Sequence, residues 1–161
     1  MTPGTIASPV TRLKGNIELS GPTILLKDVK GMPLVKISLR KGKSPDYKRA
    51  LSDSVHTALV LAFLIPDHER MQQIFELEED HFEIPPGKTS QFVVIEIIAF
   101  LGRSFSAKKK LYAGIVKNLG QSPGIDGEDI LIILHEPPTE NWGIHGGKPA
   151  SEADLGFRID V

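Results

Sequence analysis

An internal repeat is the feature that most constrains what this 161-residue chain can fold into. Residues 35–76 align with residues 95–136 at an offset of 60, without a gap. Conservative pairs such as Val55 and Ile115 lie between identical ones. The identical pairs are Ile37/Ile97, Gly42/Gly102, Ser44/Ser104, Lys48/Lys108, Leu51/Leu111, Leu59/Leu119, Ile65/Ile125 and Glu76/Glu136. Self-similarity at a fixed period indicates that one structural unit occurs twice.

Each copy has the pattern of a strand, a helix and a second strand. Runs rich in β-branched residues occupy 34–39 and 92–99,. A glycine, a basic residue and a serine follow each run, and Ser44 and Ser104 are predicted helix N-caps, with Pro45 at the favoured first helical position. Apolar residues then recur at helical spacing: Tyr47, Leu51, Val55, Leu59 and Ala62 in the first copy, and Leu111, Ile115 and Leu119 in the second,. We expect strands near 34–40, 70–76, 92–99 and 129–135, and helices near 45–64 and 105–120.

This pattern predicts an α/β fold, which some schemes class as α+β. A strand, a long crossover and a second strand indicate parallel pairing. Two tandem β-α-β units can therefore form one four-stranded sheet with two helices on one face. The other face and the sheet edges are left uncovered, which favours self-association.

The repeat also sets the expected domain organisation. Residues 1–31 form an N-terminal extension that matches nothing in the repeat, and residues 32–161 form the domain. The domain contains repeats 33–76 and 92–136, joined by an acidic, proline-containing connector over 77–91. A Gly/Pro-rich C-terminal segment, 137–161, is expected to form a short hairpin that reaches a neighbouring subunit.

Charge and composition exclude several classes of partner and chemistry. The formal net charge of -1 gives no electrostatic reason to expect a nucleic acid or an anionic membrane,. The absence of cysteine excludes disulfides, thiolate zinc sites and a cysteine nucleophile, and fits a cytoplasmic protein,. The longest apolar run, 58–65, is far shorter than the ~20 residues that a bilayer requires. The histidines lack metal-ligand spacing, so we expect neither a metal nor a cofactor.

Met32 and Pro33, followed by an apolar strand, resemble the start of a subunit of the tautomerase superfamily. The resemblance continues through 42–44, 62–63, 65–70, 102–104, 110–112 and 140–142. It covers about 120 residues, from 32 to roughly 150, and the ordered spacing of these motifs carries it. The double repeat most resembles the malonate semialdehyde decarboxylase branch. The resemblance implies a homotrimer that acts on a small carboxylate substrate.

The resemblance also implies a mechanism. Enzymes of this superfamily use an N-terminal proline, exposed by removal of methionine, as a general base. A secondary amine in an apolar pocket near cations has a lowered pKa, so it is neutral at physiological pH. Such a base can take a proton from the carbon beside a carbonyl and return it elsewhere, which is keto–enol tautomerisation. Pro33 would be this base, and the expected substrates are phenylpyruvate-like 2-oxo acids.

The remaining site residues are also implied by the resemblance. Arg103 would bind the substrate carboxylate and stabilise the enolate, with Lys43 as a second cation. Glu69 matches an acidic residue that assists or orients water in the decarboxylase branch. Trp142 and Ile144 would form the wall of the pocket. Each residue also has a simpler interpretation: a proline opening a strand, solvated turn cations, an exposed loop carboxylate and a packed tryptophan.

Two features depart from the family pattern. The decarboxylase branch has two arginines flanking one residue, whereas Leu101 occupies the first of these positions here, which favours tautomerisation over decarboxylation or hydration. In addition, Pro33 is internal as written, and its nitrogen is then an amide, which is not a base. Three explanations are open: translation starts at Met32, processing cuts before Pro33, or the extension is retained and the protein is a non-catalytic trimer of the same fold.

Overall fold

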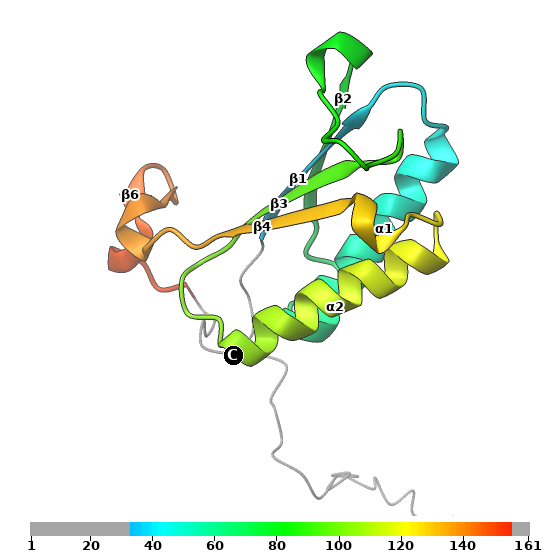
Figure 1. Cartoon of the computed structure of the whole chain (residues 1–161). Helices are drawn as coiled ribbons and strands as arrows, with labels where there is room; N and C mark the ends of the chain where they lie inside the picture. The colour runs from blue at the N-terminus through cyan, green and yellow to red at the C-terminus, as the bar shows by residue number, and fades with distance from the viewer. Residues whose placement is uncertain (1–32, 156–161) are drawn as a thin grey trace, which may run out of the picture.

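The computed structural model describes residues 33–155. The predicted extension 1–31, the expected start at Met32 and the last six residues of the C-terminal segment lie outside this range. The main elements are β1 (Leu34–Arg40), α1 (Pro45–Phe63), β2 (Met71–Leu77), β3 (Val93–Ile98), α2 (Phe105–Gln121) and β4 (Ile130–His135), shown in Figure 1. The predicted hairpin is present as β5 (Gly143–Ile144) and β6 (Lys148–Pro149).

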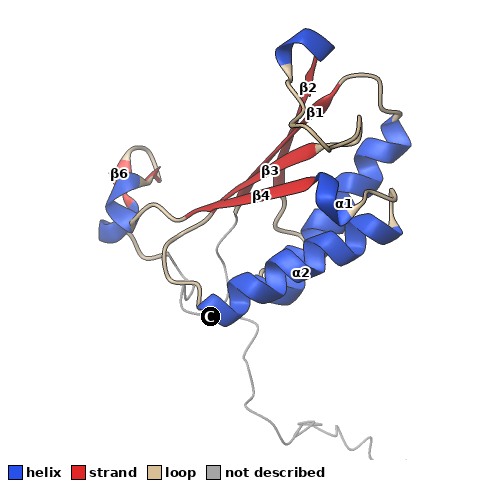
Figure 2. Ribbon diagram, viewed as in Figure 1, coloured by secondary structure: helices blue, strands red, loops and turns tan. Residues whose placement is uncertain are grey.

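The four long strands form one mixed sheet in the order β2-β1-β3-β4. The pairs β1–β2 and β3–β4 are parallel, and the central pair β1–β3 is antiparallel. Both long helices lie on the same face of the sheet (Figure 2). The predicted fold, two β-α-β units with two helices on one face, is confirmed. The antiparallel central pair relates the units by an approximate twofold axis.

The two helices begin in the same way because the repeat places the same turn before each of them. Ser44 and Ser104 have nearly identical backbone angles, with φ and ψ of -64° and 157° in the first and -64° and 155° in the second. Each hydroxyl accepts a hydrogen bond of 3.1 Å from the backbone N–H three residues later. Gly42 and Gly102 precede them with positive φ values of 105° and 138°, which a side chain would disfavour,. The predicted N-caps are therefore correct.

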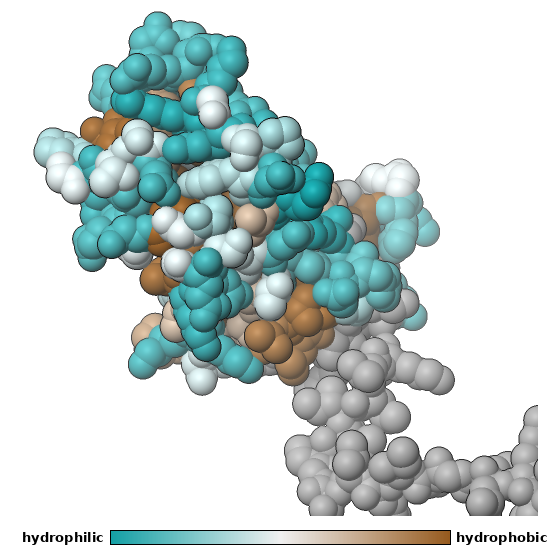
Figure 3. Space-filling view, turned by 90° about the vertical axis from the view of Figure 1, so that its right-hand side faces the viewer, coloured by the Kyte–Doolittle hydropathy of each residue, from teal (hydrophilic) through white to brown (hydrophobic). Residues whose placement is uncertain are grey.

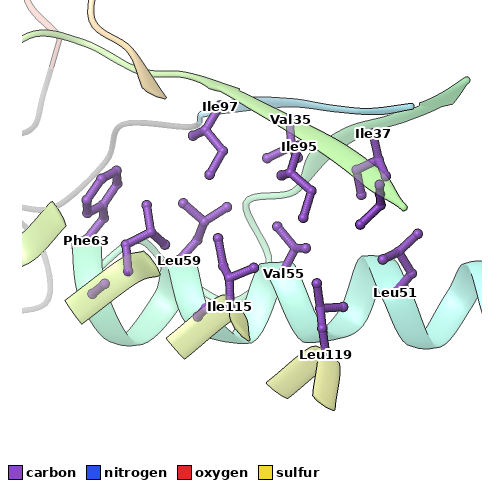
Figure 4. Packing of buried hydrophobic residues seen from close by; sticks show 14 of the residues in the cluster. Val35, Ile37, Leu51, Val55, Leu59, Phe63, Ile95, Ile97, Ile115 and Leu119 are labelled. Carbon is purple, nitrogen blue, oxygen red and sulfur yellow. The ribbon is translucent and has the colours of Figure 1, made fainter. Parts of the chain in front are cut away.

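The core lies between the sheet and the helices, and Figure 4 shows its two layers. Val35 and Ile37 of β1 and Ile95 and Ile97 of β3 point toward the helices. The helices contribute an apolar stripe that faces the sheet. Its fully buried residues include Leu51, Val55, Leu59, Leu111, Ile115 and Leu119. The apolar side chains that alternate along the strands and those at helical spacing along the helices thus pack in one cluster, as the sequence pattern predicts,.

The connector between the two units is held at the start of β4. The Asp129 carboxylate, which is 3% exposed, accepts hydrogen bonds from the backbone N–H and the hydroxyl of Thr89. The Thr89 hydroxyl and then its N–H hold the pKa of Asp129 below its ordinary value. Lys88 also forms an ion pair of 3.0 Å with Glu128. The acidic connector is thereby fixed to the second unit.

The sheet face away from the helices carries a mixture of apolar and polar side chains. Strand register and alternation place Lys36 opposite Glu96, at the centre of this face. Apolar residues surround them: Leu34, Met71, Phe75, Val94, Ile98, Leu131 and Ile133. The side of the molecule shown in Figure 3 is, by contrast, mostly hydrophilic with separate small apolar patches. Within residues 33–155, no helix has both the length and the apolar character needed to cross a membrane.

The core predicts a sharp difference between two leucines of α1. Leu59 is 1% exposed and Leu61 is 58% exposed. Replacement of Leu59 by alanine should lower the free energy of unfolding by about 2–5 kcal/mol, because it removes buried methyl groups and leaves a cavity. The matched Leu61→Ala change should cost less than about 0.5 kcal/mol. Urea denaturation of both variants tests this, and equal losses would contradict the packing described here.

Candidate functional site

Four of the predicted site residues lie at one end of the sheet. Pro33 precedes β1, and Glu69 precedes the parallel strand β2. Arg103 follows β3, which is antiparallel to β1, and Trp142 follows β4. The register confirms this placement, since Leu34 pairs with Met71 and Ile98, and Ile98 pairs with His135. The fold therefore brings to one end residues that are up to 109 positions apart.

Pro33 is buried at the entry to the central strand. In the sequence as given its nitrogen is bonded to Met32, so it is a tertiary amide without basic character. The site therefore gains an amine base only in a form of the protein whose first residue is Pro33.

Arg103 is the buried cation at this end of the sheet, with 5% of its surface exposed. Its guanidinium carbon lies 5.0 Å from the centre of the Phe63 ring, which is itself fully buried at the end of α1. This is the geometry of a cation–π contact. Burial also removes Arg103 from bulk water, so an anion here would interact with it more strongly than with an exposed arginine.

An aromatic pair lies at the same end. The Trp142 ring is tilted against Phe100, with 4.5 Å between ring centres, and Phe100 directly precedes the turn that carries Arg103. The Trp142 Nε1–H donates to the carbonyl of Pro137 at 3.1 Å, which fixes the ring orientation. The Trp142 carbonyl accepts from the Ala150 N–H at 2.8 Å, and Ile144 is half-buried in the hairpin between them.

Glu69 is half-buried in a loop that α1 holds in place. The buried His56 ring contacts the Asp67 carbonyl through Nε2 at 2.7 Å. Arg70 forms an ion pair of 2.6 Å with Asp53 of α1. The residues on both sides of Glu69 are therefore tied to the helix, which holds the backbone that carries Glu69 just before β2.

The structure does not bring Lys43 to these four residues. Lys43 follows the C-terminal end of β1, and so lies at the opposite end of the sheet from Pro33 within the chain. Its ammonium group lies 5.2 Å from the centre of the Tyr47 ring, beside a cavity of about 650 Å³ that Arg40, Lys41 and Glu78 also line. The prediction of Lys43 as a second cation of the Pro33 site receives no support from this placement.

Three neighbours of the site were not predicted from the sequence. Phe63 is the last residue of α1 and Phe100 lies just past β3, where no periodicity distinguishes a site residue from a core residue. Glu136 accepts a hydrogen bond of 3.4 Å from the Arg103 N–H. A signal for Glu136 was present, because it is one of the identical pairs of the repeat, together with Glu76.

Comparison with known proteins identifies the family of this chain. Two family models, both described as tautomerase enzymes, match residues 33–87 and 69–145, and so together extend from Pro33 into the β5–β6 hairpin. The four-stranded mixed sheet of two β-α-β units, with two helices on one face, also matches the fold of solved structures. The chain belongs to the tautomerase superfamily.

Individual relatives are similar over nearly their whole lengths. The probable tautomerase YusQ of Bacillus subtilis (strain 168) is 27% identical over 122 residues, which are 73% of this chain and 96% of YusQ. Crystal structures of malonate semialdehyde decarboxylase include one that is 26% identical, with a TM-score of 0.65, covering 72% of this chain and 93% of that one. A fused 4-OT trimer, 23% identical, has the same fold with a TM-score of 0.65 and covers 73% and 96% of the two chains.

Proposed function

We propose that this protein is a keto–enol tautomerase that acts on small, phenylpyruvate-like 2-oxo acids when Pro33 is its first residue. The observation that carries the proposal is the placement of the buried Arg103 at the same end of the sheet as Pro33. One group can act as a base and the other can bind a carboxylate, and the reaction requires both at one site. The family membership and the probable tautomerase relative support the same activity.

The proposed reaction moves one proton. The neutral Pro33 amine accepts a proton from the carbon beside the substrate carbonyl, and the electrons of the broken C–H bond form an enolate. The protonated amine then delivers the proton to the enolate oxygen, and the reverse sequence converts the enol to the ketone. Arg103 binds the carboxylate and stabilises the enolate. Glu69 orients the enol hydroxyl or a water, and Trp142 and Ile144 contact the apolar part of the substrate.

A second candidate is decarboxylation of malonate semialdehyde. The similarity to malonate semialdehyde decarboxylase, at 26% identity and a TM-score of 0.65, favours it. Leu101 disfavours decarboxylation. This side chain is 53% exposed, and it carries no charge at the position where the decarboxylase branch has its other arginine. Tautomerisation requires one cation for the carboxylate, which Arg103 supplies.

The proposal includes assembly into a homotrimer. The sheet face away from the helices contains apolar side chains on all four strands around Lys36 and Glu96, a surface that association would remove from water,. Fused 4-OT structures of the same fold are trimers. One further form competes with the catalytic proposal: a protein that retains residues 1–31 has no Pro33 amine and would be a non-catalytic trimer.

The free amine of Pro33 is the first testable element. A form that begins at Met32 should lose that methionine, since proline is small, and should catalyse ketonisation of phenylenolpyruvate. The 161-residue form should be slower by the general-base contribution, typically ~10²–10⁴-fold. The short form retains every residue of the buried core, which lies within 35–125. Ultraviolet absorbance of the enol provides the measurement, and N-terminal sequencing verifies the first residue.

Two variants of the short form separate the roles of the Pro33 amine and the Arg103 guanidinium. Pro33→Ala should lose much of the activity, because a primary amine is a weaker base here, and Arg103→Ala should act mainly by raising KM. Equal activity of the long and short forms would show that Pro33 is not the base.

The second prediction concerns the choice between reactions. The short form should enolise phenylpyruvate faster than it decarboxylates malonate semialdehyde. Leu101→Arg should shift this ranking toward decarboxylation, because it restores a second guanidinium beside Arg103. If Leu101→Arg changes neither rate, the absence of this arginine does not determine specificity. Coupled assays of both substrates on both proteins decide between these results.

The third prediction concerns assembly. Sedimentation at micromolar concentration should give the mass of three chains of 17.6 kDa. Ile133 on the open sheet face and Val116 on α2 are both 37% exposed in the single chain, so they form a matched pair. Ile133→Glu should dissociate the trimer because it introduces a charge into an apolar interface, whereas Val116→Glu should not. A single-chain mass for the unmodified protein would contradict the proposal.

A further inference from the structure

We propose that Glu136 is a positioning residue that fixes Arg103 for carboxylate binding. The inference rests on the proposed function, in which Arg103 binds the substrate. Glu136 itself lies one residue past the end of β4 and is not among the residues assigned to contact substrate. Its contribution would be made through the turn that carries Arg103.

The Glu136 carboxylate connects three parts of the second unit. Its Oε1 accepts a hydrogen bond of 3.4 Å from the backbone N–H of Arg103. Its Oε2 accepts a hydrogen bond from the Nζ of Lys108, in the first turn of α2. The side chains of Lys108 and Glu136 are 26% and 12% exposed, so solvent screens this ion pair less than a surface pair,. The turn, the helix start and the strand end are thereby held together.

The turn requires such a restraint because of Gly102. This residue precedes Arg103 and has a φ of 138°, a conformation that glycine adopts easily and also leaves easily,. A carboxylate that holds the next N–H fixes the direction in which the Arg103 side chain leaves the backbone. Displacement of the guanidinium from its position against Phe63 would reduce carboxylate binding, since catalytic geometry tolerates little displacement,.

The repeat provides an internal control for this role. In the first unit Lys48 and Glu76 form the equivalent ion pair, at 2.7 Å, with side chains 27% and 30% exposed. This pair lies beside Lys43, at the opposite end of the sheet from Pro33. Both pairs stabilise the start of a helix, but Glu136 alone of the two is next to Arg103. A comparison of Glu136 with Glu76 therefore separates positioning from stability.

Steady-state kinetics of the short form test the inference. Glu136→Met should raise KM for phenylenolpyruvate roughly 10-fold, the effect expected when a hydrogen bond to a charged group is lost. Its kcat should change less than about two-fold, and the pH profile of kcat/KM should be unchanged because the base is untouched. Glu76→Met should leave KM unchanged. Glu136→Gln keeps an acceptor for the Arg103 N–H and should give an intermediate KM. If Glu136→Met does not fold, Glu136→Gln is the variant that tests the inference.

A measurement on the full chain keeps this inference distinct from the proposed function. In nitrogen-15 NMR spectra, the Nε–H signal of Arg103, assigned with Arg103→Lys, should shift and broaden in Glu136→Met or Glu136→Gln and remain unchanged in Glu76→Met. If the unmodified short form has no tautomerase activity, the proposed function fails, and the NMR comparison alone decides the positioning role. An unchanged Arg103 signal in the Glu136 variants, or an equal KM in the Glu136 and Glu76 variants, would overturn the inference.

Discussion

The antiparallel pairing of β1 with β3 is the contact on which the rest of this structure depends. Each β-α-β unit buries only one side of its strands, and the two units complete a common core by joining at this pair. The same pairing places the first residue of one unit beside the turn that ends the first strand of the other. Pro33 and Arg103, which occupy different units, thus reach one end of the sheet.

The pairing also explains why two similar units provide unequal chemistry. The approximate twofold axis relates the Arg103 end of the sheet to the Lys43 end, and the ion pairs Lys108–Glu136 and Lys48–Glu76 occur at both. Only one end lies where the chain enters the first strand. The shared pairs stabilise the common architecture, whereas buried Arg103, Phe63 and the Trp142–Phe100 contact make one end different.

Much of the architecture could be predicted because it depends on local, repeated patterns. Ser44 and Ser104 begin helices within the predicted ranges, and the strands begin and end within one or two residues of the expected positions. The shifts have physical causes. For example, Asp129 belongs to a short 3-10 turn and binds Thr89, so β4 begins at Ile130. The placement of Lys43 away from Pro33 was not foreseen. Lys43 and Arg103 occupy equivalent positions in the two repeats, and the repeat alignment does not show at which end of an antiparallel strand pair each of them lies.

By itself the sequence determined the number and type of elements, the units they form and the side chains that face the core. These properties depend on the spacing of residues along the chain. They can be predicted from apolar alternation, helical periodicity and capping residues. Tertiary structure alone decided which distant residues share an end of the sheet, and that Arg103 is buried against Phe63 while Leu101, two positions earlier, is exposed. The reason is physical: burial and proximity arise from strand order and register, which depend on the whole sheet and not on any local segment.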